Sequence, residues 1–84
     1  MNSREMFGRG LAEIRRSRGM TQAQVAEKAG LAMQFVAALE QGVKAPSFET
    51  LDGLCEVLGV QPDELLSKDA AELPHKIYEL ADSL

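Results

Sequence analysis

The side chains that most often carry nucleophilic or metal chemistry are scarce in this sequence, which has Cys55 as its only cysteine and His75 as its only histidine. A lone cysteine forms neither an intramolecular disulfide nor a thiolate zinc cluster. Cys55 lies on the apolar face of an expected helix and is best explained as a small core residue, and His75 simply follows Pro74. The acidic residues occupy expected exposed helical positions without a catalytic partner. We therefore expect no catalytic residue, no metal site and no cofactor, and hence no enzyme.

Charge is divided unevenly along the chain. Residues 1–46 carry seven basic and four acidic side chains, a net charge of +3, whereas residues 47–84 carry two basic and nine acidic ones, a net charge of −7. The first half is suited to approach phosphate groups and the second is repelled by them, although solvated surface explains both halves equally well. The overall charge of −4 is unusual for a protein that binds nucleic acid.

The 84 residues suffice for one domain with a modest core, and 45% hydrophobic and 26% charged residues are typical of a globular chain. Arg4, Glu5 and Arg9 interrupt the first ten residues, so neither a secretion signal nor a membrane-spanning helix is expected there. The single cysteine favours a reducing compartment. These features predict a cytoplasmic protein without a membrane partner.

The spacing of apolar residues predicts helices and no strand, and a glycine follows most of the helices. The expected helices span about residues 3–18, 21–29, 33–41, 47–58 and 62–66. Thr21 opens a T-x-x-Q capping box, Ser47 is a good N-cap, and Pro62 suits a first helical position. The expected inward positions are Phe7, Leu11, Ile14, Val25, Ala26, Ala29, Phe35, Val36, Leu39, Leu51, Leu54, Cys55, Leu58, Leu65 and Leu66.

The second and third expected helices are short, are joined by a tight turn, and form a wedge small enough to enter a DNA major groove. Helical hairpins of this kind also occur in proteins that bind no DNA. The stretch from Arg15 to Gly42, RRSRGMTQAQVAEKAGLAMQFVAALEQG, with the later APSFETL and LGVQPDELL, resembles the phage-repressor and Cro-like (Xre-type) helix-turn-helix family over about residues 7–66. The resemblance implies an all-α, five-helix lambda-repressor-like domain and a dimeric transcriptional regulator that binds double-stranded DNA.

The resemblance also assigns candidate DNA contacts. Gln22, at the start of the second helix, would donate to a phosphate beside the free helix amides. Gln34 would pair with an adenine edge, and the apolar side chains around it would contact thymine methyl groups. Gln41 and Lys44 would lie near the backbone and fix the register. The complete expected set is Gln22, Met33, Gln34, Ala37, Ala38, Gln41 and Lys44.

Other matching positions are expected to be structural or depart from the family pattern. Arg15 would form a structural ion pair with Glu40, whereas Arg16 and Arg18 would add nonspecific attraction to phosphates. Ala32 stands where members carry a side-chain cap for the third helix, at a cost of about 1 kcal/mol. Ala38 also replaces the arginine or glutamine of many members, so we expect modest direct readout of bases.

Residues 69–84 are expected to form a sixth, C-terminal helix beyond a DNA-binding domain of residues 1–68. The apolar residues of this extension are spaced by 4, 3 and 4 positions and would form one edge of the helix. Because five helices complete the core of the family, this edge is better explained as a dimerisation seam than as core cover. The seam residues are Leu73, Ile77, Leu80 and Leu84.

These features favour a sequence-specific regulator that binds a palindromic operator as a homodimer, with the third helix in the major groove. Within that class, a compact controller of a neighbouring operon, as in restriction-modification or phage control systems, fits as well. The alternative is a protein-interaction module, antitoxin-like or an adaptor, that binds a protein partner through its acidic C-terminal half. The absence of a basic residue from the third helix favours this alternative.

Overall fold

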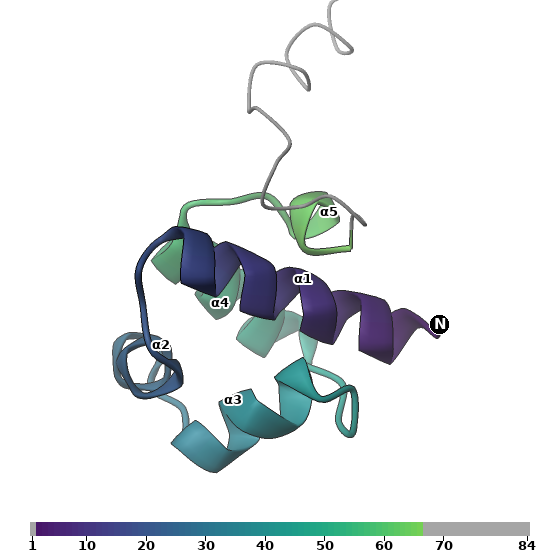
Figure 1. The fold of residues 1–84 in the computed structure, drawn as a ribbon, viewed down its shortest axis with the longest axis horizontal. Helices are drawn as coiled ribbons and strands as arrows, with labels where there is room; N and C mark the ends of the chain where they lie inside the picture. Colours follow the sequence, from purple (N-terminus) through teal and green to yellow (C-terminus); the bar gives the residue numbers. More distant parts are fainter. Residues whose placement is uncertain (1, 67–84) are drawn as a thin grey trace, which may run out of the picture.

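The computed structural model describes residues 2–66, which form five α-helices and no strand. The helices are α1 (Ser3–Ser17), α2 (Gln22–Ala29), α3 (Met33–Glu40), α4 (Phe48–Leu58) and α5 (Pro62–Leu65). Figure 1 shows α1 crossing the middle of the molecule, with α5 on one side of it and the α2–α3 pair on the other. The expected all-α, five-helix fold is confirmed. The expected sixth helix, with Leu73, Ile77, Leu80 and Leu84, lies outside the described residues.

Side-chain caps begin the helices where the sequence predicts them. The Thr21 hydroxyl oxygen accepts the Gln24 amide proton at 3.0 Å, and the Thr21 amide donates to Gln24 Oε1 at 2.8 Å. Ser47 accepts from the amide of Thr50 at 3.1 Å. Gly30 ends α2 with a φ of 69°, in the left-handed region that favours glycine. These local interactions fix the bounds of the helix pair.

The core lies between α1 and the other four helices. Its largest fully buried side chains come from all five helices: Leu11, Ile14, Val25, Val36, Leu39, Leu54 and Leu65. Removing each such side chain from water contributes roughly 1.5–3 kcal/mol, so this core holds α2 and α3 in place against α1.

Two expectations about single side chains are wrong. Leu66 was expected to face inward but keeps 45% of its surface exposed, because α5 is one short turn that buries only Leu65 fully. Glu64 was expected to be solvated but is 5% exposed, and its Oε1 accepts from the Gln61 amide at 3.3 Å. Glu64 therefore caps the start of α5 as part of a capping box.

Two glycines let α1 approach its neighbours closely. A Cβ atom at Gly8 would overlap the carbonyl oxygen of Leu39 in α3, and one at Gly10 would overlap the carbonyl oxygen of Leu65 in α5. Both obstacles are backbone atoms, which cannot rotate away as a flexible side chain can. Glycine at these two positions therefore sets the distance at which α3 and α5 pack on α1.

Candidate nucleic-acid interface

Helix α3 exposes one face because its opposite face supplies the core. Val36 and Leu39 are fully buried, whereas Met33 keeps 48% of its surface exposed and Gln34 is also exposed. Ala37 and Ala38 are half-buried, and Gln41, the C-cap residue of α3, is exposed. Positions 33, 34, 37, 38 and 41 lie on one side of a helix with 3.6 residues per turn. Five of the expected contact positions thus share one accessible face.

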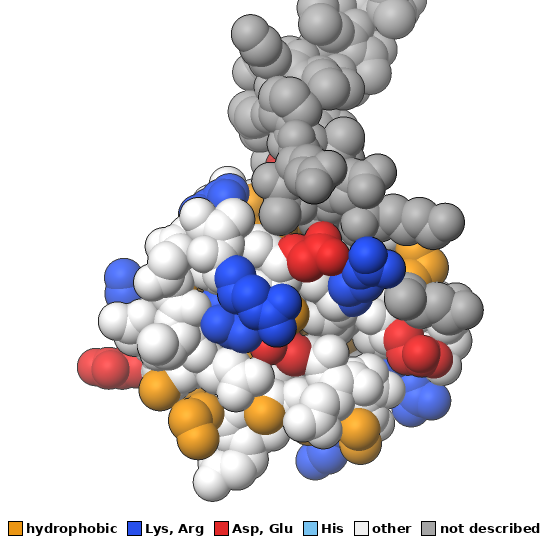
Figure 2. Space-filling model, in the orientation of Figure 1, with side chains coloured by type: hydrophobic (Ala, Val, Ile, Leu, Met, Phe, Trp, Pro, Cys, Tyr) orange, Lys and Arg blue, Asp and Glu red, His pale blue; other side chains and the backbone are white. Residues whose placement is uncertain are grey.

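The outward edge of α3 is apolar and uncharged. Its sequence from Met33 to Glu40 contains no basic residue, and Figure 2 shows apolar and uncharged side chains along the edge of the molecule over α3, with basic side chains over α1. Lys44, in the loop after α3, is exposed, and its Nζ lies 5.9 Å from the centre of the Phe35 ring. This contact is within the range of a cation–π interaction and keeps the positive charge beside the end of α3.

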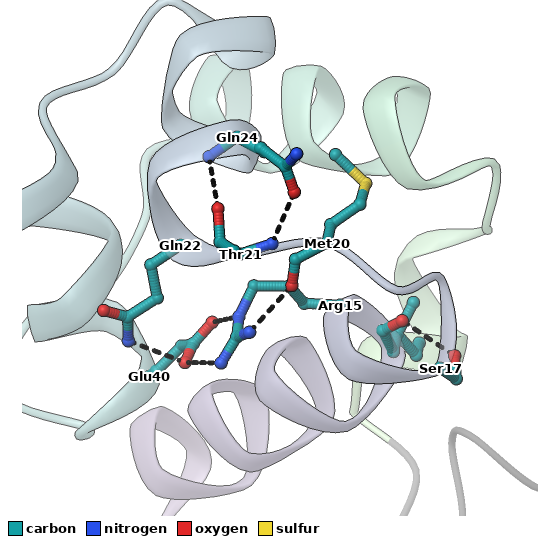
Figure 3. Close-up of polar contacts among 8 residues, drawn as sticks. Arg15, Ser17, Met20, Thr21, Gln22, Gln24 and Glu40 are labelled. Carbon is teal, nitrogen blue, oxygen red and sulfur yellow. Dashed lines mark hydrogen bonds and ion pairs between the residues drawn. The ribbon is translucent and has the colours of Figure 1, made fainter.

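Gln22 begins α2 and is half-buried. Its Nε2 donates to Glu40 Oε1 at 3.0 Å, as the close-up in Figure 3 shows. A side-chain amide has two N–H donors, so this bond leaves the second donor for an acceptor outside the protein. The internal bond, which the sequence analysis did not anticipate, connects the start of α2 to the end of α3.

Arg15 and Glu40 form a bidentate ion pair between α1 and α3. Arg15 Nε lies 2.6 Å from Glu40 Oε2, and Nη2 donates to Oε1 at 3.0 Å. The two side chains are only 11% and 6% exposed. Arg15 Nη1 also donates to the carbonyl oxygen of Met20 at 2.9 Å. The hydrogen bond to Glu40 raises the pKa of the Arg15 guanidinium above its ordinary value, so the guanidinium stays charged.

Arg18 makes two contacts within the protein that the sequence analysis did not anticipate. Its Nε donates to the carbonyl oxygen of Leu58 at 3.1 Å, and its Nη1 donates to Ser17 Oγ at 3.1 Å. A cation at the carboxyl end of a helix satisfies a free carbonyl group and complements the helix dipole. Arg18 therefore stabilises the end of α4, and both Arg18 and Arg16 are exposed.

The N-terminus of α3 has the capping defect that the sequence predicts. Ala32 occupies the N-cap position with an extended backbone, and no side-chain hydrogen bond caps the helix there. By contrast, α1, α2 and α4 begin at Asn2, Thr21 and Ser47, each of which accepts a backbone amide proton. The Phe35 amide donates to the carbonyl oxygen of Ala32 at 3.0 Å, so it is the amides of the two preceding residues that remain available to another acceptor.

Cys55 is a core residue, as expected, with 8% of its surface exposed. Burial raises the pKa of its thiol, and the nearby carboxylates of Asp52, Glu64 and Asp63 raise it further. A raised pKa leaves little of the reactive thiolate near neutral pH. Within residues 2–66, no group of three potential metal ligands comes together. No helix in that range is long and apolar enough to cross a membrane.

Known proteins with a similar sequence or fold are helix-turn-helix regulators. The sequence model of the helix-turn-helix family matches residues 11–65. The HTH-type transcriptional regulator y4dJ of Sinorhizobium fredii is 36% identical over 67 residues, which cover 80% of this chain and 87% of y4dJ. The immunity repressor of Bacillus phage phi105 is 34% identical over 74% of this chain but only 43% of the repressor. The crystal structure of the restriction-modification controller protein C.AhdI from Aeromonas hydrophila matches with a TM-score of 0.71 and 31% identity, over 74% of this chain and 94% of C.AhdI.

Proposed function

The chain belongs to the phage-repressor and Cro-like helix-turn-helix family of DNA-binding transcriptional regulators, which are not enzymes, and on this premise we propose that it binds a palindromic operator as a homodimer, with α3 in the major groove. The observation that carries the proposal is the outward face of α3. Met33 and Gln34 are exposed at its start while the core holds its other face. A helix fixed in this way presents its outward side chains to base edges without having to become ordered first.

Each contact residue has a distinct proposed role. Gln34 reads an adenine, and Met33, Ala37 and Ala38 contact thymine methyl groups or allow close approach of the helix. Gln22 donates its second amide proton to a phosphate, and Gln41 and Lys44 lie beside the backbone after α3. With these roles, Gln34 should supply specificity for one base pair, whereas Lys44 should supply affinity for DNA of any sequence.

Dimerisation is assigned to the C-terminal extension. Residues 69–84, with Leu73, Ile77, Leu80 and Leu84, would form the seam, and residues 1–68 would form the DNA-binding domain. Two-fold pairing must place the two α3 helices about 34 Å apart to match successive major grooves. The similarity to a phage immunity repressor and to a restriction-modification controller supports control of a neighbouring operon.

Selection from a random pool of double-stranded DNA at about physiological salt tests the proposal. A sequence-specific dimer enriches two inverted half-sites separated by about one helical turn. A pool without an enriched motif would contradict the proposal and would favour the protein-interaction module, for which the lack of a basic residue in α3 is the supporting observation.

Replacing Gln34 by alanine tests the assigned readout. A bidentate contact to a base contributes about 1–3 kcal/mol of discrimination, so Gln34→Ala should weaken binding by roughly 5- to 150-fold for each half-site and relax the preference at one base pair of each half-site. Lys44→Ala is the matched comparison, because loss of a phosphate contact weakens all sequences alike and lowers the slope of affinity against salt by about one unit for each bound chain. Titrations of operator and scrambled DNA at several salt concentrations measure both effects. Equal operator selectivity in the parent and in Gln34→Ala would remove the assignment.

A further inference from the structure

An apolar groove of about 330 Å³ lies between the start of α1, the loop before α4 with the first turn of α4, and the end of α5. Its lining includes Phe7, Pro46, Phe48, Leu51, Leu66 and the cationic Arg4. Phe48 is 87% exposed and Leu66 is 45% exposed. A large apolar side chain that is almost fully exposed beside an apolar groove is typical of a surface that is covered by a binding partner.

The position of the groove along the chain indicates what covers it. Leu66 is the last described residue and itself lines the groove, so residues 67–84 continue from the groove rim. This segment contains the apolar series at 73, 77, 80 and 84. Its acidic side chains outnumber its basic ones by four to two, which complements Arg4 at the rim.

Two copies of this apolar series would bury too little surface against each other to hold two chains together, so the series requires a larger binding surface. Twelve residues, 73–84, would make about three helical turns, a length at which an isolated helix is marginal in water. The same length falls short of the three to four heptads of a sustained coiled coil. A preformed apolar groove supplies the missing contact area, because its walls are already fixed by the folded domain.

We propose that residues 73–84 of one chain dock in this groove of a second copy, so that two chains exchange their C-terminal segments. The proposal rests on the homodimer proposed above and names the surface that accepts the seam. A stable homodimer requires an interface of about 1,200 Å² or more. Reciprocal exchange covers Phe48 and its neighbours twice, whereas docking within one chain would contribute nothing to association.

Substitutions on the two sides of the proposed contact test it. Phe48→Ser in the groove and Ile77→Asp in the segment should each raise the dimer dissociation constant at least tenfold, and the double variant should lose little more than either one. Val43→Ser is the matched control, because Val43 is 62% exposed but does not line the groove. Sedimentation equilibrium of the full chain measures the constants, and circular dichroism checks that each variant is folded. A monomeric parent chain, or a dimer unaffected by Phe48→Ser, would overturn the proposal.

Crosslinking distinguishes exchange from docking within one chain. Chains carrying Ala45→Cys at the groove and chains carrying Ala81→Cys in the segment are mixed and treated with a short bismaleimide. Exchange predicts a covalent dimer of unlike chains. The parent chain is the control, because its only cysteine, Cys55, is buried. If a crosslink forms only within a chain that carries both replacements, or if none forms, the segment does not dock in a second copy.

Failure of the groove assignment can be distinguished from failure of the regulator proposal. If the parent chain and Phe48→Ser are equally dimeric and enrich the same palindrome, the groove assignment fails while the regulator proposal stands. If the parent chain enriches no DNA motif while Phe48→Ser dissociates the dimer, the regulator proposal fails and the groove assignment stands.

Discussion

Glu40 is the side chain on which the positions of three helices depend. Its carboxylate accepts from Arg15 of α1 and from Gln22 of α2 while it is itself part of α3. Figure 3 shows these partners converging on the two carboxylate oxygens. Family resemblance implies the pairing with Arg15, but the sharing with Gln22 depends on how α2 packs against α3. The same carboxylate therefore stabilises the fold and orients a proposed phosphate contact.

Glu40→Ala should lower the free energy of unfolding by about 3–5 kcal/mol, because it leaves the guanidinium of Arg15 buried without its counter-ion. Glu13→Ala is the matched control. Glu13 pairs with Arg9 at 2.9 Å, but the Arg9 side chain is 55% exposed. That replacement should change the free energy by less than about 1 kcal/mol. Urea unfolding followed by circular dichroism compares the two variants, and equal losses would show that burial does not distinguish the two pairs.

Local signals predicted the helices well. Of the contacts between helices, family resemblance supplied the Arg15–Glu40 pair, and close approaches of backbone atoms were not predicted. Thr21, Ser47 and Pro62 act on backbone groups a few residues away, so the sequence near each one is sufficient to locate a helix start. The close approaches at Gly8 and Gly10 involve backbone atoms of Leu39 and Leu65, more than thirty positions along the chain. No periodicity in the sequence reports such a contact. The exposed Leu66 escaped prediction for the same reason.

For the candidate DNA contacts too, the sequence predicted the local geometry but not the role of the side chains. Helical periodicity places Met33 and Gln34 opposite the buried Val36 and Leu39, and the structure has this arrangement. Their assignment to bases came from family resemblance, since exposure alone does not distinguish a DNA contact from ordinary surface. The groove beside Phe48 had no sequence signal, because its walls come from α1, the loop before α4, the start of α4 and the end of α5.

Helix α3 can be stabilised at its first residue. Ala32→Ser introduces a hydroxyl that can accept an amide proton at the uncapped start of α3, and should raise the free energy of unfolding by about 1 kcal/mol. Ala23→Ser is the control, because Ala23 lies within α2, where serine has a slightly lower helix propensity and no cap to form. Thermal and urea unfolding of both variants measure the change. A variant at residue 32 no more stable than the parent chain would show that the amides at the start of α3 are satisfied in another way.

Over the whole molecule, the charge distribution and the proposed dimer act on DNA affinity in opposite directions. The proposed contact surface belongs to the half of the sequence with a net charge of +3, and the proposed seam belongs to the half with −7. The acidic half lowers affinity for DNA of any sequence, because it repels phosphates. Pairing of two chains raises affinity for a palindrome, because the second half-site is bound at a high effective concentration.

Removal of residues 70–84 separates these two effects. The shortened chain loses three acidic side chains and one basic one, and should be monomeric. Its affinity for the full palindrome should fall by about 100-fold or more, since the avidity of two linked sites is lost. Its affinity for a single half-site should be unchanged or slightly higher, because the removed segment carries a net negative charge. Titration of both DNAs with the two chains, together with sedimentation equilibrium, measures these differences. If the shortened chain stayed dimeric and bound the palindrome as before, the dimer contact would have to lie within residues 1–69.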